Sequence, residues 1–194
     1  MMISLAQKSD ALKIAKIHKA EINKGFLSSL PITFLKIFYV ALIKSPFSFC
    51  VVAKENNEVE GFASGVTDLN KFYQYFLTHY FFQSLVILLP KTFSSLKKII
   101  ETLLYPKKEE SLPKTELLVI AIKKEFQGKG LGKLLLDAFL IQMKQRNINM
   151  FKVVVGQELP NAIKFYEKNN FTFIKNMTIH GNTVSRVYCY EIIN

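Results

Sequence analysis

Residues 126–140 read FQGKGLGKLLLDAFL, in which three glycines at alternate positions are followed by a long apolar run. The first turn of a helix leaves its backbone N–H groups without partners and carries a partial positive charge. Glycines at such a turn let an anion approach the backbone without meeting a Cβ atom. The stretch therefore predicts a phosphate-binding turn that leads into a helix from Leu131 to about Arg146.

Two common phosphate-binding patterns do not fit this stretch. A Walker A loop needs G-x-x-x-x-G-K-[ST], but Leu134 follows Gly132-Lys133 and no glycine lies five residues before Gly132. A dinucleotide fingerprint needs G-x-G-x-x-G, but the residue three after Gly130 is Lys133. Neither ATP-type nor dinucleotide binding is indicated.

Apolar runs on both sides of the glycines predict an α/β domain. Residues 117–122 and 151–155 are almost continuously apolar, as in strands covered on both faces, and with the helix between them they form a parallel crossover. An asparagine pair at residues 56–57 predicts an antiparallel hairpin. The expected order is strand, helix, helix, strand, strand, inserted helices, strand, helix, strand, helix, strand, strand. This order predicts a mixed sheet in one domain spanning residues 1–194.

The inserted segment, residues 70–112, is rich in aromatic residues. Residues 72–89 carry no formal charge, and a helix of that length spans roughly 27 Å, short of the ~30 Å hydrocarbon core of a membrane. Polar side chains dilute its hydrophobicity. We expect a buried or partner-facing helix here, with contact to a membrane surface as the alternative and a transmembrane span least favoured. A second helix is expected after Pro90.

The composition indicates which classes of binding partner are favoured. The net charge is +11, yet only Arg146 and Arg186 are arginines, the residue that usually grips phosphates and bases in a bidentate manner. The charge is best interpreted as a solvated lysine surface, then as a site for an anionic ligand, and last as a nucleic-acid surface. Cys50 and Cys189 lie in strand-like runs without disulfide or metal spacing, which predicts buried thiols, no metal and a cytoplasmic location. No signal peptide is recognised at the start.

Three segments together resemble the GCN5-related N-acetyltransferase (GNAT) family. Gln127-Gly128-Lys129-Gly130-Leu131-Gly132 matches the Q/R-x-x-G-x-G/A signature of that family. The preceding IAIKKEFQGKG looks like its fourth strand and pyrophosphate loop, and LPNAIKFYEKNNF is similar to its second signature segment. The resemblance covers residues 116–173. It implies an acyl-CoA N-acyltransferase fold, a mixed central sheet of about seven strands flanked by helices. The aromatic-rich helical insertion between the third and fourth strands departs from the family pattern.

The resemblance also implies acetyl-CoA as the acetyl donor and assigns a set of binding groups. Backbone N–H groups in the glycine stretch would hold the pyrophosphate, with Lys129 and Lys133 as charged neighbours. The pantetheine arm would lie where the fourth and fifth strands splay apart, Asn161 would bind that arm, and the N–H of Ile122 would face the thioester oxygen. The expected donor-binding residues are Ile120, Ile122, Gln127, Gly128, Lys129, Gly130, Leu131, Gly132, Lys133 and Asn161.

Two residues occupy catalytic positions of the family. Tyr166 would protonate the departing thiolate, the alternative being a tyrosine that only packs the short helix on the sheet. Glu116 aligns with a general-base glutamate of histone-type members, the alternative being an exposed residue that ends a loop.

Other polar residues are weaker candidates. His18 and His79 are better interpreted as core histidines than as catalytic ones. Asp68 and Tyr73 flank the insertion, which would wall the acceptor site or form a dimer surface, and they could touch an acceptor. The sequence leaves open whether the protein forms a homodimer.

These observations predict an N-acetyltransferase that transfers an acetyl group from acetyl-CoA to a primary amine by direct attack. The expected acceptor is a small molecule such as an amino sugar, a nucleotide sugar or a polyamine. A protein N-terminus or lysine is the alternative acceptor. A module that binds acetyl-CoA without catalysis, as a sensor or partner protein, is the rival from another functional class.

Overall fold

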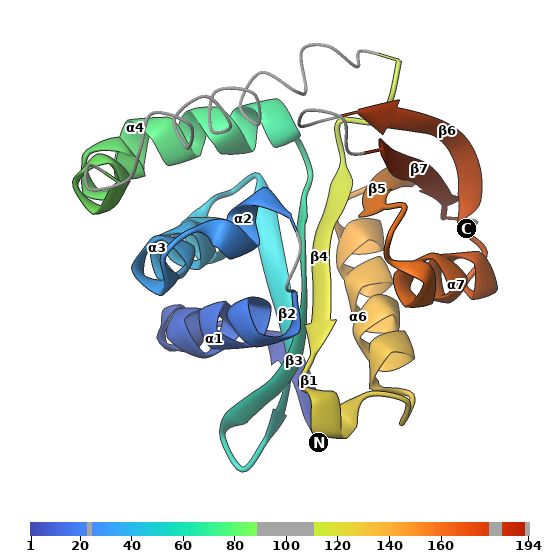
Figure 1. The fold of residues 1–194 in the computed structure, drawn as a ribbon, viewed down its shortest axis with the longest axis horizontal. Coiled ribbons are helices and arrows are strands. Elements are labelled where there is room, and N and C mark those ends of the chain that lie inside the picture. Colours follow the sequence, from blue (N-terminus) through green and yellow to red (C-terminus); the bar gives the residue numbers. More distant parts are fainter. Residues whose placement is uncertain (23–24, 89–110, 179–183, 193–194) are drawn as a thin grey trace.

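A single mixed sheet organises the chain (Figure 1). The computed structural model describes residues 1–22, 25–88, 111–178 and 184–192. Within these ranges seven strands lie in the order β1-β2-β3-β4-β5-β7-β6, and only β4 and β5 run parallel. The strands are β1 (Met2–Leu5), β2 (Ser48–Glu55), β3 (Glu58–Val66), β4 (Glu116–Ile122), β5 (Met150–Gly156), β6 (Thr172–Thr178) and β7 (Val184–Glu191). The predicted mixed α/β sheet is confirmed.

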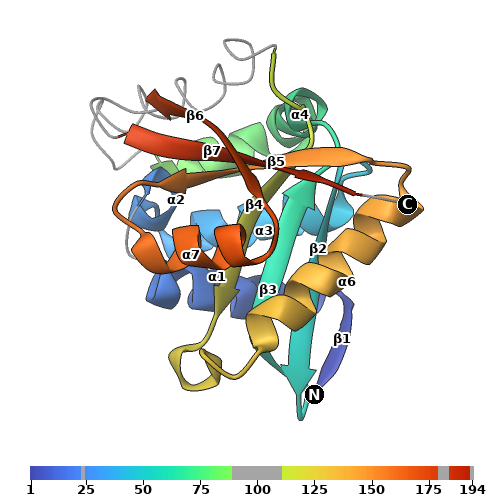
Figure 2. The same cartoon turned by 90° about the vertical axis from the view of Figure 1, so that its right-hand side faces the viewer.

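Helices cover both faces of the sheet (Figures 1 and 2). One face carries α1 (Ala11–Glu21), α2 (Phe26–Ser29), α3 (Ile32–Lys44) and α4 (Leu69–Leu88). The other face carries α6 (Leu131–Gln145) and α7 (Pro160–Lys168). Two short 3-10 turns, η1 (Lys8–Asp10) and η2 (Lys124–Phe126), precede α1 and follow β4.

The alternation of side chains along the strands explains the two cores. In β2, Cys50 and Val52 join the core under α1, α3 and α4, whereas Phe49 and Val51 join the core under α6 and α7. Successive strand residues point to opposite faces, so a strand with helices on both sides is apolar throughout. This is why these strands show continuous apolar runs rather than alternation. Cys50 is buried as predicted, but Cys189 is only partly buried.

The hairpin and the insertion follow the sequence pattern closely. Asn56 and Asn57 both adopt positive φ angles, 51° and 64°, between β2 and β3. The insertion begins with α4, and the second helix expected after Pro90 lies outside the described residues. Phe72 and Phe76 in the first half of α4 pack against α3, whereas Phe82 in its second half is 80% exposed. One side of this helix is therefore buried, whereas Phe82 leaves a large apolar side chain exposed, and the partner-facing alternative stays a prediction.

Candidate functional site

A cleft opens where β4 and β5 part. The two strands pair at only two positions, Glu116 with Lys152 and Leu117 with Val153. On its other edge β4 pairs with β3, and the register shifts so that Leu118 is passed over between Val119 and Leu117. An extra residue of this kind forms a bulge, which bends the strand and increases its twist. The splay expected between the two strands is therefore present, and the bulge gives a physical reason for it.

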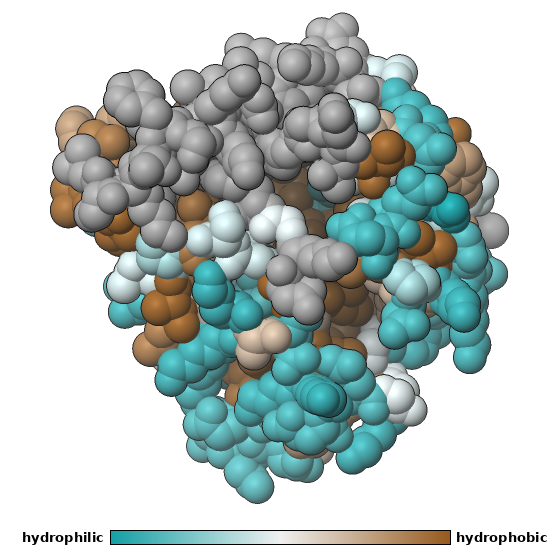
Figure 3. Space-filling view, viewed as in Figure 1, coloured by the Kyte–Doolittle hydropathy of each residue, from teal (hydrophilic) through white to brown (hydrophobic). Residues whose placement is uncertain are grey.

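The cleft has a volume of about 1810 Å³, and apolar atoms are visible in a recess on this face (Figure 3). We distinguish a glycine end, formed by residues 127–133 with Asn161 and Phe165, from an acidic end, formed by Phe38, Tyr73 and Glu116. The six-residue rise from Glu116 to Ile122 separates these ends by roughly 20 Å along β4. A middle wall of His18, Leu27 and Ser28 lies between α1 and α2.

The glycine end presents backbone N–H groups. No acceptor within the described residues bonds to the N–H groups of residues 128–132, whereas the N–H of Lys133 donates to the carbonyl of Gly130 at 3.1 Å. Five consecutive free donors precede and begin α6, where the helix dipole adds partial positive charge. The loop therefore forms a concave set of donors suited to an anion with several oxygens.

The glycines of this loop serve two purposes. Gly128 and Gly130 have φ angles of 73° and 84°, the left-handed region that residues with a Cβ adopt only with strain. Gly132 has ordinary helical geometry, but a Cβ there would lie 3.2 Å from the ring of Phe165. The first two glycines shape the loop, and the third lets α6 approach α7.

An acidic residue from α1 holds the loop in place. Glu21 accepts one hydrogen bond from the backbone N–H of Lys124 and another from Nε2 of Gln127, both at 3.1 Å. The same Gln127 nitrogen donates to the carbonyl of Ile122 at 2.8 Å. Sequence reasoning missed Glu21, since no local pattern connects it with residues more than a hundred positions away.

Lys129 and Lys133 bring less free positive charge to the glycine end than the sequence predicts. Lys133 lines the cleft but forms an ion pair with Asp137. The ammonium of Lys129 lies 5.8 Å from the centre of the Phe126 ring and does not line the cleft. The side chain of Leu131 is buried in the core, so only its backbone faces the loop. The glycine end therefore offers an anion mainly backbone N–H groups.

The open edge of β4 offers further amides. The N–H of Lys123 donates to the carbonyl of Glu60 on β3, at 2.9 Å. Because successive N–H groups of a strand point to opposite edges, those of Ile122 and Ile120 point away from β3, toward the gap. Both residues line the cleft. An extended ligand could therefore pair with this edge as an added strand.

Two candidates from α7 line the opposite side of the cleft. Asn161 is exposed in its first turn. Tyr166 is 5% exposed and packs against Phe165 and Phe171. Burial raises the pKa of Tyr166 above the usual phenol value, which keeps the hydroxyl protonated at neutral pH.

The acidic end contains one buried carboxylate. Glu116 is 8% exposed, so the exposed alternative considered for it is wrong. Its Oε2 atom lies 3.3 Å from Nζ of Lys152, yet it makes no hydrogen bond within the described residues. Burial raises the pKa of Glu116, and the Lys152 ammonium acts in the opposite direction. Burial and the Glu116 charge together raise the pKa of Tyr73, which shares this end of the cleft.

His18 belongs to a buried network in the middle wall. Its Nδ1 atom lies 2.6 Å from the hydroxyl of Tyr39, and its Nε2 atom lies 3.1 Å from Oγ of Ser28. Burial, and then the charge of Lys19, lower the pKa of His18 to about 4. The residue is a neutral, hydrogen-bonded core histidine, as expected, although it also lines the cleft.

Other candidates lie elsewhere. Asp68 caps α4, where it accepts a hydrogen bond from the N–H of Lys71 at 3.0 Å, and it does not line the cleft. The expectation that His79 is a core histidine is wrong, because the residue is exposed and stacks on Tyr75 one turn earlier.

The described residues contain neither a cluster of metal ligands nor a membrane-spanning helix. In the described part of the chain no three His, Cys, Asp or Glu side chains gather as metal ligands. None of the described helices, α4 included, combines the length and hydropathy that a membrane crossing requires.

Comparison with known sequences gave a family match over most of the chain. Residues 19–171 match the Acetyltransferase (GNAT) family. Mycothiol acetyltransferase from Propionibacterium freudenreichii subsp. shermanii is 27% identical over 66 residues, which make up 34% of this chain. The matched part is 21% of the length of that protein, so the chain aligns with only about a fifth of this curated relative.

Several solved structures share the fold. A GNAT-family acetyltransferase from Desulfovibrio desulfuricans has a TM-score of 0.65 at 13% identity, over 99% of both chains. Ribosomal-protein-S18-alanine N-acetyltransferase from Escherichia coli has a TM-score of 0.63 at 15% identity, over 98% of this chain and 93% of its own. The acetyltransferase yncA from Salmonella typhimurium, with its cofactor acetyl-CoA, has a TM-score of 0.61 at 16% identity, over 100% of this chain and 95% of its own.

Proposed function

The chain belongs to the acetyltransferase (GNAT) family, whose co-substrate is acetyl-CoA, and we propose that it acetylates the primary amine of a small molecule. The observation that carries this proposal is the row of free N–H groups at residues 128–132, placed at the mouth of the gap between β4 and β5. A diphosphate fits the row of donors, and an extended arm fits the free edge of β4. Such a ligand matches coenzyme A.

The donor would be held mainly by backbone groups. The N–H groups of residues 128–132 would bind the pyrophosphate, with Gln127 and Glu21 fixing the loop that presents them. The free-edge amides of Ile122 and Ile120 would bind the pantetheine arm as it runs from the glycine end toward Glu116, and Asn161 would contact the arm from α7. The thioester oxygen would then lie beyond Ile120, because Ile122 is roughly 20 Å from Glu116 along β4. Lys133 would add charge beside the pyrophosphate, partly offset by Asp137.

In the proposed reaction the amine nitrogen attacks the thioester carbonyl carbon, a C–N bond forms and the C–S bond breaks. Glu116 accepts the proton that the amine loses, directly or through water, and Tyr166 donates a proton to the departing thiolate. The raised pKa of Tyr166 suits a donor that must stay protonated until the thiolate leaves. Neither Cys50 nor Cys189 lines the cleft, which favours direct attack over an acyl-cysteine intermediate.

The acidic end supports a small acceptor. Tyr73 from the insertion helix lies close enough to Glu116 to sense its charge, and Phe38 from α3 lines the same cleft. This arrangement suits a compact cationic amine, such as an amino sugar or a polyamine, better than a long peptide. A matched relative is named mycothiol acetyltransferase, and mycothiol is a small molecule. A protein N-terminus is the second candidate, because a structural neighbour is named for acetylating a ribosomal protein.

Two measurements test this proposal. Calorimetry at low ionic strength should detect binding of coenzyme A. Release of free CoA thiol from acetyl-CoA should depend on a small amine drawn from a panel of amino sugars, amino nucleotide sugars and polyamines. Turnover of peptides alone would overturn the acceptor class, and affinity without thiol release for any amine would favour a binding module.

Substitution of Tyr166 separates catalysis from binding. Tyr166→Phe should reduce kcat about 100-fold while the Kd of coenzyme A stays unchanged, because only the proton donor is removed. Tyr75→Phe is the matched control, since Tyr75 lies on α4 outside the cleft. Equal turnover in the two variants would exclude Tyr166 as the acid.

A further inference from the structure

Lys152 is a buried cation that the proposed reaction leaves without a role. It lies on β5 directly opposite Glu116 in the parallel register, and its side chain is 5% exposed. Its ammonium does not line the cleft but lies behind the carboxylate, 3.3 Å from Oε2 of Glu116. Buried ammonium groups are costly unless paired, so this placement requires the partner that Glu116 supplies.

The contacts of the pair anchor the ammonium beside the carboxylate. Nζ of Lys152 donates to the carbonyl of Pro113, which anchors the ammonium in the segment before β4. Oε2 of Glu116 receives no hydrogen bond within the described residues. Oε2 is buried against Lys152, which compensates the carboxylate charge, while Glu116 itself lines the cleft.

Few other titratable groups face the pair from the elements packed around it. Tyr73 reaches Glu116 from α4, and Cys189 lies opposite Lys152 on β7 in the antiparallel register. Burial raises the pKa of both groups, so both are neutral near pH 7. In the described part of the chain, Lys152 is thus the cation that opposes the burial of Glu116.

We propose that Lys152 is a positioning residue, which keeps Glu116 ionised inside the apolar cleft so that it can accept the proton of the acceptor amine. The inference rests on the proposed function of Glu116. A carboxyl at this depth without a cation would hold its proton near neutral pH and could not act as a base. The cation makes a buried base usable in the apolar cleft.

A direct measurement uses ¹³C-labelled glutamate and follows the carboxyl signals by NMR as a function of pH, with Glu116→Gln to assign the signal. Lys152→Met should raise the pKa of Glu116 by roughly one to three pH units, because an opposite charge at this distance is lost. Lys152→Arg should restore the original value. An unchanged Glu116 pKa in Lys152→Met would overturn the inference.

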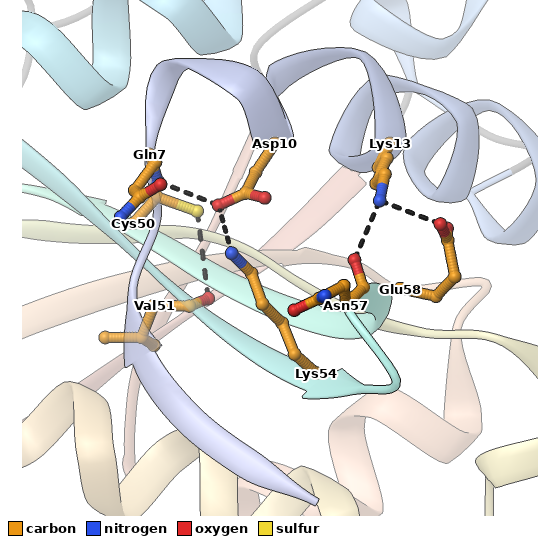
Figure 4. A network of polar contacts seen from close by, with 8 residues as sticks. All are labelled: Gln7, Asp10, Lys13, Cys50, Val51, Lys54, Asn57 and Glu58. Atoms are coloured by element: carbon orange, nitrogen blue, oxygen red, sulfur yellow. Dashed lines mark hydrogen bonds and ion pairs between the residues drawn. The ribbon is translucent and has the colours of Figure 1, made fainter.

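Lys54→Met is the matched control. Lys54 forms a comparable ion pair with Asp10 at 2.7 Å, between β2 and η1 and away from the cleft (Figure 4). The Lys54→Met variant should leave the pKa of Glu116 unchanged. If Lys152→Met fails to fold, Lys152→Gln, which keeps a polar group near the Pro113 carbonyl, takes its place in the same measurement, and an unchanged Glu116 pKa would again overturn the inference.

Kinetics distinguish this inference from the proposed function. With the best acceptor of the amine panel, the acid limb of kcat/KM should move to higher pH in Lys152→Met, whereas loss of packing alone would lower the rate without moving the limb. If Glu116→Gln keeps full activity and the wild-type profile, the proposed role of Glu116 fails. If Glu116→Gln is impaired but the limb stays in place in Lys152→Met, only the role of Lys152 fails.

Discussion

The two ends of the cleft are built in different ways. The glycine end presents free backbone N–H groups from one continuous stretch, residues 128–132. The acidic end is made of side chains from three separate elements, Phe38 of α3, Tyr73 of α4 and Glu116 of β4. In the proposed function, the backbone groups bind the part of acetyl-CoA that never varies, whereas the side chains select the acceptor.

This difference bears on how freely each end of the cleft can change its residues. A loop of backbone donors needs glycines and a helix start, and few other sequences provide them. A set of side chains can change one residue at a time without disturbing the sheet. We therefore expect substitutions at the glycine end to alter the affinity for coenzyme A and substitutions at the acidic end to alter the chemistry and the acceptor.

The largest effect is expected at the acidic end. Glu116→Gln should lower kcat/KM for the amine about 100-fold, because the proton acceptor is lost while its shape is kept. Calorimetry should find the affinity for coenzyme A unchanged. Glu58→Gln, which removes an exposed carboxylate paired with Lys13 outside the cleft (Figure 4), is the control. A large loss of coenzyme A affinity in Glu116→Gln would contradict the expectation that the acidic end affects only the chemistry and the acceptor.

The buried His18 of the middle wall should make the free energy of unfolding fall in acid. The pKa of His18 is about 4 in the folded protein, against about 6.5 in an unfolded chain. Below pH 6.5 the unfolded chain binds a proton that the folded protein rejects until near pH 4, so stability falls as the pH falls through this window. Urea denaturation should show a loss of about 2 kcal/mol between pH 7 and pH 5 from this residue.

Variants identify the residue responsible for that loss. His18→Gln should flatten the pH dependence of the unfolding free energy, at some cost in stability at pH 7. His79→Gln should leave it unchanged, because His79 is exposed. Equal pH dependence in wild type and His18→Gln would refute the assignment.

At the glycine end a smaller effect on binding is expected. Gly130→Ala places a Cβ on a residue with a φ of 84°, a strain of about 1–2 kcal/mol, which should weaken coenzyme A binding about tenfold as the loop relaxes. Calorimetry at low ionic strength measures the change. Asn57→Ala places the same side chain at a φ of 64°, in the turn between β2 and β3 outside the cleft, and should leave the affinity unaltered.

The smallest effect is expected where α1 supports the loop. Glu21→Ala removes two hydrogen bonds that hold Gln127 and Lys124, and should raise the KM for acetyl-CoA about threefold with kcat unchanged. Steady-state kinetics at saturating amine measure this. Glu125→Ala, which removes a neighbouring exposed acid in η2, should behave as wild type. A fall in kcat alone would place Glu21 in the chemistry instead.

Particular residues show where sequence reasoning succeeded and where it stopped. The glycine loop, the asparagine turn at residues 56–57 and the parallel crossover were predictable, because each depends on a few neighbouring residues. His79 was placed in the core because it lies in an aromatic helix, but the helix turns that residue to solvent. Glu21 and Lys152 were not recognised, since each gains its partner only through the packing of distant elements.

The sequence by itself determined the family, the mixed α/β sheet and the place of the glycine loop that we propose binds the pyrophosphate, since these follow from local patterns of glycine and apolar residues. Only the tertiary structure decided that Glu116 is buried against Lys152, that Tyr73 of the insertion helix lies beside it, and that Glu21 supports the glycine loop. The physical reason is that charge, burial and hydrogen bonding depend on which distant side chains become neighbours, and chain order does not encode this locally.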